Sequence, residues 1–179
     1  LMKPVDGPVQ VLAAKADIKD VTGDRGADPK ALTIGSDGNL YVSDDSSDSV
    51  LRIDPASGSV EQVVSRSDLE GLPGIDSIDL DGGVVGGADG MLYVTSDGSP
   101  DAIIAIDTAS GEASVLTSGT PFGDLDVYAT VAPNGDLIVA DDGNDTIYRV
   151  DSETGEVSVF LSESELEAVA GTRAAAEGG

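Results

Sequence analysis

The sequence predicts an all-β fold made of repeated four-stranded units, and three observations lead to this prediction. Three segments align almost without gaps, each a turn dipeptide followed by a strand: 37–45, 89–97 and 134–142. Their turn glycines Gly38, Gly90 and Gly135 are 52 and 45 residues apart. Asp outnumbers Glu by 25 to 9, which favours turns over helices. A four-stranded unit that repeats at about 40 to 50 residues is typical of a β-propeller blade.

Within each unit, short apolar runs predict four antiparallel strands in order. The first strands are expected at 31–34, 83–85 and 128–131, and the second strands follow the Asp-Gly or Asn-Gly turns, which supply positive φ. The third strands are expected at 50–54, 103–107 and 147–151, and the fourth at 60–64, 113–116 and 157–161. Turns that close on Gly58, Gly111 and Gly155 join them. The chain thus reads as one partial propeller over 1–179, with blades at about 28–64, 78–117 and 124–161.

The segments between the blades repeat as well. Residues 14–23, 65–74 and 162–171 align over ten positions, and we expect each to hold about one helical turn, with Ser65 and Ser162 as N-caps. Residues 9–12 match the fourth strands and predict an extra outer strand before the first blade. Residues 172–179 are expected to form a tail or the start of a next blade.

The succession Asp37-Gly38-Asn39-Leu40-Tyr41-Val42, an Asp-rich loop, an apolar strand ending in Asp and a Gly-closed turn resembles the NHL-repeat and SMP-30 (gluconolactonase)-like six-bladed propellers. The resemblance covers roughly residues 9–171. It implies an architecture rather than an activity, because that superfamily includes lactonases, lyases and non-catalytic interaction modules. Since three blades do not close a ring, we expect either the missing blades of a longer parent chain or a homodimer that closes the propeller.

The net charge of −25 excludes several classes of function. Nine Lys and Arg among 34 acids form no basic face for nucleic acid, and the same sign disfavours anionic membranes. Without His or Cys there is no His-based nucleophile system and no thiolate chemistry. No apolar run is long enough for membrane insertion. The first four residues lack a signal-peptide core, so we expect either a cytosolic protein or one whose leader has been removed. The second, with an extracellular or periplasmic location, is favoured, and a high-salt source is one possible reason for the charge.

A group of acids at the entrance to the inner strands is the candidate metal site. Its members are Asp28, Asp79, Asp81, Asp124 and Asp126. Hard oxygen ligands suit Ca²⁺, and clustered carboxylates need a cation to offset their repulsion. The resemblance to SMP-30-like lactonases implies a divalent metal in the channel, although this sequence offers no clear Asn ligand. The competing interpretation is that these acids are solvated loop residues.

Two further sets of polar residues have structural interpretations. The Asp-rich loops 44–49, 97–101 and 141–146 do not meet the EF-hand pattern, and we expect their side chains to hold the turns. Tyr41 and Tyr93 share a strand position, which indicates packing, and Arg52 and Arg149 are expected to pair with nearby carboxylates. Lys30 and Tyr128 lie near the channel mouth. A lone Lys among acids has its charged form stabilised and is a poor base.

These features favour a non-catalytic propeller that serves as a scaffold or binding module through its loops and channel face. The alternative is a metal-dependent lactonase or esterase-like hydrolase of the SMP-30 type, in which a Ca²⁺-like ion polarises a carbonyl and a channel Asp acts as base.

Overall fold

The computed structural model describes residues 11–87, 90–123 and 129–176, and its strands form three four-stranded antiparallel sheets, each in sequence order. The first sheet, blade 1, contains β1 (Pro29–Ile34), β2 (Leu40–Asp44), β3 (Ser49–Ile53) and β4 (Val60–Val64). Blade 2 contains β5 (Val84–Gly86), β6 (Met91–Ser96), β7 (Ala102–Asp107) and β8 (Ala113–Ser118). Blade 3 contains β9 (Ala129–Val131), β10 (Leu137–Asp141), β11 (Thr146–Val150) and β12 (Val157–Leu161). The predicted β-propeller blades are confirmed.

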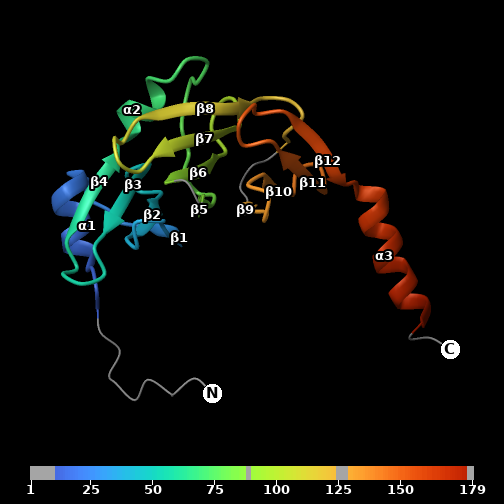
Figure 1. Ribbon diagram of the computed structural model, residues 1–179, viewed down its shortest axis with the longest axis horizontal. Coiled ribbons are helices and arrows are strands. Elements are labelled where there is room, and N and C mark those ends of the chain that lie inside the picture. Colours follow the sequence, from blue (N-terminus) through green and yellow to red (C-terminus); the bar gives the residue numbers. More distant parts are fainter. Residues whose placement is uncertain (1–10, 88–89, 124–128, 177–179) are drawn as a thin grey trace.

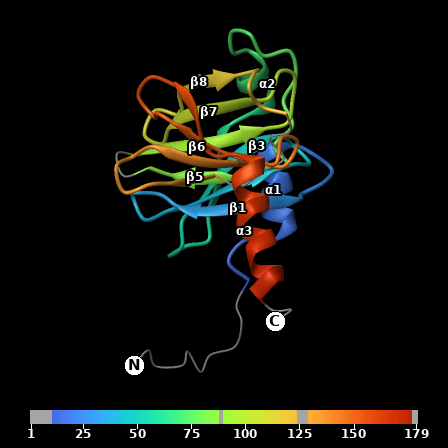
Figure 2. The same ribbon diagram turned by 90° about the vertical axis from the view of Figure 1, so that its right-hand side faces the viewer.

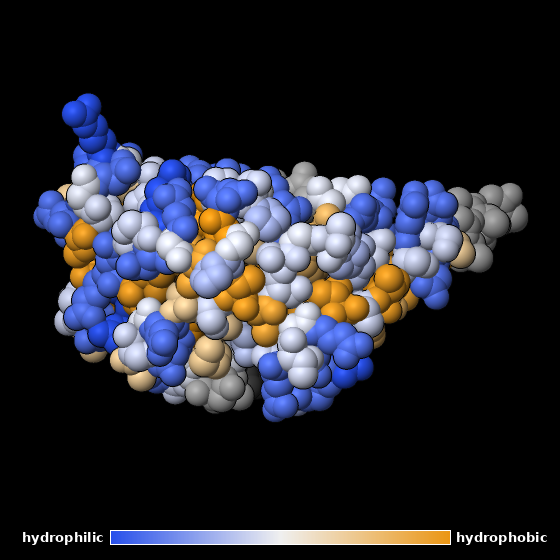
Figure 3. Space-filling model, turned by 90° about the horizontal axis from the view of Figure 1, so that it is seen from above, coloured by the Kyte–Doolittle hydropathy of each residue, from blue (hydrophilic) through white to orange (hydrophobic). Residues whose placement is uncertain are grey.

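The blades stand side by side in an arc, with blade 2 in the middle (Figure 1). The innermost strands β1, β5 and β9 are neighbours on the concave side, and β4, β8 and β12 lie outside. Figure 2, turned by a quarter, shows the sheets stacked and α3 leading away from them. Seen from the outer side of the arc, hydrophilic residues border a broken band of apolar residues (Figure 3). No helix in the described ranges is long and apolar enough to cross a membrane.

Turn chemistry repeats from blade to blade as predicted. Gly38, Gly90 and Gly135 have φ values of 82°, 89° and 96°, the left-handed region that the hairpin turns need. In the outer turn of blade 1, the Asp54 carboxylate accepts hydrogen bonds from the backbone N–H of Ala56 and Ser57. These bonds, first that from Ala56, hold the pKa of Asp54 below its usual range. Asp107 and Asp151 make the same turn in blades 2 and 3.

Hydrophobic cores lie between the blades, so each blade has two faces with different partners. We call the face toward the N-terminal neighbour the leading face and the opposite one the trailing face. Tyr41 and Val50 on the trailing face of blade 1 pack with Leu92 and Val94 on the leading face of blade 2. A second core joins blades 2 and 3 in the same way. A third, smaller core lies between the leading face of blade 1 and α1.

The connecting helices are α1 (Lys15–Thr22), α2 (Arg66–Glu70) and α3 (Glu163–Ala176). Ser65 caps α2 as predicted, since its hydroxyl accepts the Asp68 N–H. The expectation of about one turn holds for α2 only. α3 extends over 14 residues because its sequence is rich in Ala and Glu, strong helix formers that carry it past Gly171. Residues 172–176 therefore belong to α3 and do not begin a strand, while 177–179 lie outside the described residues.

The extra outer strand expected at 9–12 has a mixed outcome. Residues 9 and 10 lie outside the described ranges, and Val11 and Leu12 belong to no strand. Leu12 nevertheless lies against Gly58 in the outer turn of blade 1. In blades 2 and 3 the corresponding glycines, Gly111 and Gly155, lie against the fourth strand of the preceding blade.

Candidate functional site

A groove runs across the three innermost strands on the concave side of the arc. It has a volume of about 470 Å³ and is lined by residues of β1, β5 and β9 together with Gly83. Its walls are about equally polar and apolar: Leu32, Val84 and Val131 supply apolar surface, and Thr33, Thr130 and the backbone supply polar groups. Strand pairing fixes this surface, because each inner strand is held along its blade by the second strand.

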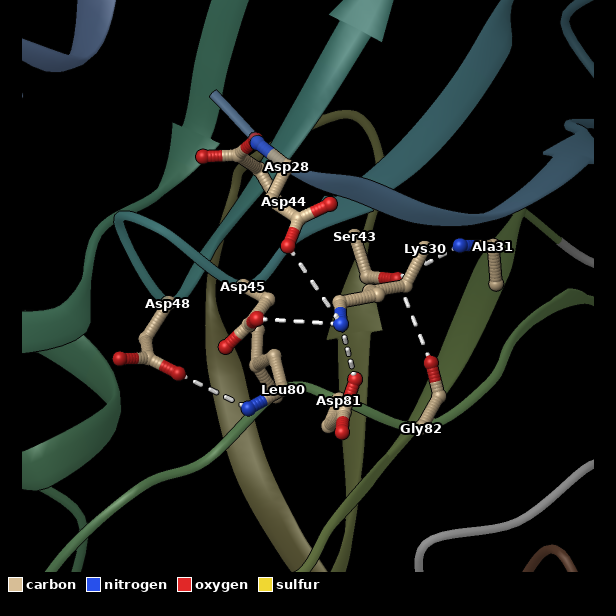
Figure 4. A network of polar contacts seen from close by, with 10 residues as sticks. All are labelled: Asp28, Lys30, Ala31, Ser43, Asp44, Asp45, Asp48, Leu80, Asp81 and Gly82. Atoms are coloured by element: carbon tan, nitrogen blue, oxygen red, sulfur yellow. Dashed lines mark hydrogen bonds and ion pairs between the residues drawn. The ribbon is translucent and has the colours of Figure 1, made fainter. Parts of the chain in front are cut away.

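Lys30 lies at one end of the groove and bridges blades 1 and 2 (Figure 4). Its Nζ is 2.6 Å from Asp81 Oδ1 in the segment that enters blade 2. It is also 3.2 Å from Asp45 Oδ2 and 3.5 Å from Asp28 Oδ2, both of blade 1. Three carboxylates thus share one ammonium group, which offsets their mutual repulsion.

The same contacts decide the protonation state of Lys30. The hydrogen bond to Asp81 and then that to Asp45 raise the pKa of the ammonium group well above its ordinary value. A lysine held in its charged form donates hydrogen bonds and cannot accept a proton from a substrate. The prediction that Lys30 is a poor base therefore rests on named contacts.

The three predicted metal ligands that the structure describes, Asp28, Asp79 and Asp81, do not form one cluster. Asp28 and Asp81 are brought together by Lys30, and Asp124 and Asp126 lie outside the described residues. Asp79 instead approaches Asp45 and Asp48, with one carboxylate oxygen of each within 4.8 Å of the others. Of these three, Asp79 is exposed and Asp48 is buried. The cation expected at the entrance to the inner strands remains a prediction.

Asp48 is a polar residue whose role the sequence did not reveal. It is buried, and its φ is 44°. Its Oδ1 accepts the backbone N–H of Leu80 at 2.8 Å, and its Oδ2 is paired with the Arg66 guanidinium of α2. One carboxylate of blade 1 thereby holds both the connecting helix and the entry to blade 2. Its place in an Asp-rich loop indicated only a local turn, because Leu80 is 32 residues away.

A related bond recurs in every blade at the end of the second strand. Asp44 in blade 1 accepts the N–H of Asp28 at 2.6 Å, and Asp141 in blade 3 accepts that of Gly123 at 2.9 Å. In blade 2, the Ser96 hydroxyl accepts the backbone N–H of Asp79 at 3.1 Å. Asp44 and Asp141 are buried, so these acids anchor the backbone at the blade entrance. The expectation that these side chains hold their own turns agrees with two further bonds: Asp141 accepts the N–H of Asn144, and Asp44 accepts the Ser47 hydroxyl. The bonds to the blade entrance are additional.

The other candidate side chains have packing or pairing roles. Tyr41 is buried between blades 1 and 2, and its hydroxyl donates to Asp37 at 2.9 Å. Arg52 pairs with Glu61, and Arg149 pairs with Asp136, as predicted. Tyr128 lies outside the described residues.

We expect Lys30→Gln to lower the Tm in low-salt buffer, because three carboxylates lose their shared cation. The loss should shrink as salt is added, since salt screens the repulsion that remains. Folding raises the pKa of Lys30 above its ordinary 10.5, so its contribution is complete below that value and disappears only as the pH rises through the folded pKa. The difference in Tm should therefore be constant between about pH 6 and 9.

Lys30→Arg is the matched control, because it keeps the charge and should retain most of the Tm. Equal Tm values for the wild type and Lys30→Gln at low salt would show that the cluster is not held by this cation.

The blades and their shared inner groove define an open array of β-propeller blades, and the comparisons agree with this class. A family model described as a repeat of unknown function (DUF6923) matches residues 35–176, and the chain belongs to this family. Among curated proteins, none matches the chain.

Solved structures of the β-propeller type resemble the fold. A chain in the nidogen/laminin complex has a TM-score of 0.56 at 16% identity, and the match covers 75% of this chain and 49% of that one. Virginiamycin B lyase from Staphylococcus aureus has a TM-score of 0.58 at 20% identity, covering 74% and 40%. The extracellular domain of BT4673 from B. thetaiotaomicron has a TM-score of 0.52 at 13% identity, and the match covers 76% of this chain and 16% of that one. The chain thus spans less than half of each, and identities this low show the fold alone.

Proposed function

We propose that the chain is a non-catalytic β-propeller binding module whose ligand surface is the groove across β1, β5 and β9. The observation that supports this proposal most is the state of Lys30. Among the described residues that line the groove, Lys30 is the one ionisable side chain, and its ammonium group is already held by three carboxylates. The groove therefore offers apolar contact and hydroxyl groups for recognition rather than a group for proton transfer.

The charge of the chain favours a cationic ligand. A net charge of −25 attracts cations toward the surface and speeds their association at low salt. The groove walls suit apolar side chains, since Leu32, Val84 and Val131 line them. A basic peptide that also carries apolar side chains combines both properties, and we take this class as the partner.

The test uses a fluorescent peptide of alternating Lys and Leu. We expect saturable binding that weakens as salt rises, because the attraction is partly electrostatic. Thr130 is exposed on β9 and lines the groove, so Thr130→Trp should fill it and weaken binding about tenfold or more, equivalent to about 1.4 kcal/mol. Because Thr130 pairs with Ile138 at the open face of blade 3, the mass of the variant in solution is measured beside its affinity. The chain has no other Trp, so the new indole also reports contact by its fluorescence.

Thr130→Ser is the matched control and should bind as the wild type does, because it keeps the hydroxyl and adds no volume. Unchanged affinity in Thr130→Trp would place the ligand elsewhere, and no binding of the peptide by the wild type would contradict the proposed ligand class.

Kinship with the NHL-repeat and SMP-30-like superfamily is part of this proposal, supported by the repeated turn and strand pattern and by the shared fold. A metal-dependent hydrolase of lactones is the second candidate, favoured by the approach of Asp45, Asp48 and Asp79. It ranks second because Asp45 already contacts Lys30 and Asp48 already pairs with Arg66. Calcium-dependent turnover of a simple lactone, lost in Asp79→Asn, would reverse this order.

An extracellular or periplasmic location also belongs to the proposal. Its support is the likeness of fold to the nidogen/laminin complex and to the extracellular domain of BT4673.

A further inference from the structure

The trailing face of blade 3 repeats a surface that is buried twice elsewhere in the chain. Tyr41 and Tyr93 occupy the same repeat position on the trailing faces of blades 1 and 2, and they are 0% and 5% exposed. Ile138 holds that position in blade 3 and is only partly buried. Ile147, also partly buried, corresponds in the same way to the fully buried Val50 and Ile103. Blade 3 therefore carries the apolar face of a seam without the neighbour that covers it.

The outer strand of blade 3 is likewise less buried than those of blades 1 and 2. A β-bulge interrupts the pairing of the third and fourth strands in every blade, and its extra residue is Val63, Leu116 or Phe160. Val63 packs into the core between blades 1 and 2, and Leu116 packs into the core between blades 2 and 3. Phe160 is 54% exposed.

Blade 1 presents the complementary surface, a leading face without a blade in front of it. Val84 of blade 2 is 4% exposed because blade 1 covers it, whereas Leu32 at the same repeat position in blade 1 is 61% exposed. A largely apolar groove of about 430 Å³ lies there, lined among others by Leu32, Leu40 and Val42. α1 and Leu12 form its other wall.

Leu12 occupies the place of a neighbouring outer strand. In both internal seams, a glycine in the outer turn of one blade lies against the bulged strand of the preceding blade. A Cβ on Gly155 would collide with the Leu116 carbonyl oxygen, and one on Gly111 would come unusually close, at 3.1 Å, to that of Val63. A Cβ on Gly58 would collide with the Leu12 carbonyl oxygen. Leu12 thus stands where the residue corresponding to Phe160 would stand in a full seam.

The two ends differ in charge. Residues 11–30, beside the leading face of blade 1, carry four acids and four cations, the latter at Lys15, Lys19, Arg25 and Lys30. Residues 129–176, which hold blade 3 and α3, carry ten acids and the two cations Arg149 and Arg173. The acidic trailing end of one copy therefore meets a leading end whose charges balance, and not a second acidic surface.

We propose that two copies of this chain associate head to tail, with the trailing face of blade 3 in each docked on the leading face of blade 1 in the other. Phe160 of one copy takes the position of Leu12 in its partner, and α3 takes that of α1, which is the same connector of the repeat. Docking therefore requires Leu12 and α1 to leave the leading face of blade 1, where Ile18 now packs. After that change both new seams repeat the two internal ones. The two sets of three blades close a ring of six, within the usual range for propellers. This inference goes beyond the binding function, since it requires no ligand.

The test is the mass in solution of the full chain, measured by sedimentation equilibrium over a concentration series. We expect twice the chain mass of 18.0 kDa. Phe160→Asp should return the mass to that of one chain, because it buries a charge in each new seam. Leu32→Asp, on the opposite face, should do the same. Both side chains are exposed in the single chain, so far-UV circular dichroism should show an unchanged fold.

Val159→Asp is the matched control. Val159 is the preceding residue of β12 and is 59% exposed, but its counterpart Val115 packs toward the preceding blade, away from the proposed seam. This variant should stay dimeric. A monomeric wild type, an assembly larger than two chains, or a dimer that survives Leu32→Asp would overturn the head-to-tail ring.

Discussion

Asp48→Ala should lower the free energy of unfolding by about 3 kcal/mol, because it removes a buried acceptor that holds two separate elements. The Leu80 N–H loses its partner inside the protein, and Arg66 loses its buried counter-ion. The φ of 44° adds strain for alanine, which enters this region less readily than Asp. Urea unfolding followed by circular dichroism measures the change.

Two variants separate the causes of that loss. Asp48→Asn keeps an acceptor for Leu80 and tolerates the positive φ, so it should cost about 1 kcal/mol through the lost charge. Asp145→Ala is the matched control, because Asp145 has the corresponding loop position in blade 3 and a φ of 47° but is exposed. Its cost should be limited to backbone strain, about 1 kcal/mol. An Asp48→Ala variant no less stable than Asp145→Ala would contradict the bridging role.

Leu69→Ala is expected to cost about 3 kcal/mol, because it opens a cavity in the core between blades 1 and 2. Leu69 on α2 is fully buried there, together with side chains of both blades. Leu166 on α3 occupies the same position in the connector repeat but is only partly buried. In the Phe160→Asp background, where this end of the chain stays free of a second copy, Leu166→Ala should therefore change the free energy of unfolding by less than about 1 kcal/mol, as measured by the same urea transitions.

Equal losses of unfolding free energy in the two leucine variants would contradict this expectation, because α2 in the seam and α3 at the end of the array would then contribute equally to stability. The account requires the difference, since it attributes the stability of the array to contacts between neighbouring blades.

The repeat explains why the blades could be predicted from the sequence. Turn pairs such as Asp37-Gly38 and Asn134-Gly135 constrain the backbone locally, and the alternating apolar residues after them define strand faces. Both signals depend on nearby residues and occur three times. The length of α3 could not be predicted by aligning it with α1 and α2, because its Ala-rich end changes the local helix preference.

The candidate site was less accessible to sequence analysis, for a physical reason. Asp28 and Asp81 could be recognised as acids at blade entrances, but the cation that joins them is Lys30, which belongs to blade 1 while Asp81 enters blade 2. The pairing of Asp48 with Arg66 and Leu80 likewise depends on how blades pack. Contacts across a seam follow from the stacking of repeats, and a single repeat carries no signal for them.

The central claim is that the carboxylates of Asp28, Asp45, Asp48 and Asp81 are structural groups with partners already in place, and calcium titration tests it most directly. Lys30 contacts Asp28, Asp45 and Asp81, and Arg66 pairs with Asp48. We therefore predict that millimolar Ca²⁺ leaves the Tm of the wild type unchanged relative to the same ionic strength of Na⁺. A rise in Tm that is specific to Ca²⁺ and abolished by Asp79→Asn would contradict the claim, because it would show a metal centre at Asp45, Asp48 and Asp79.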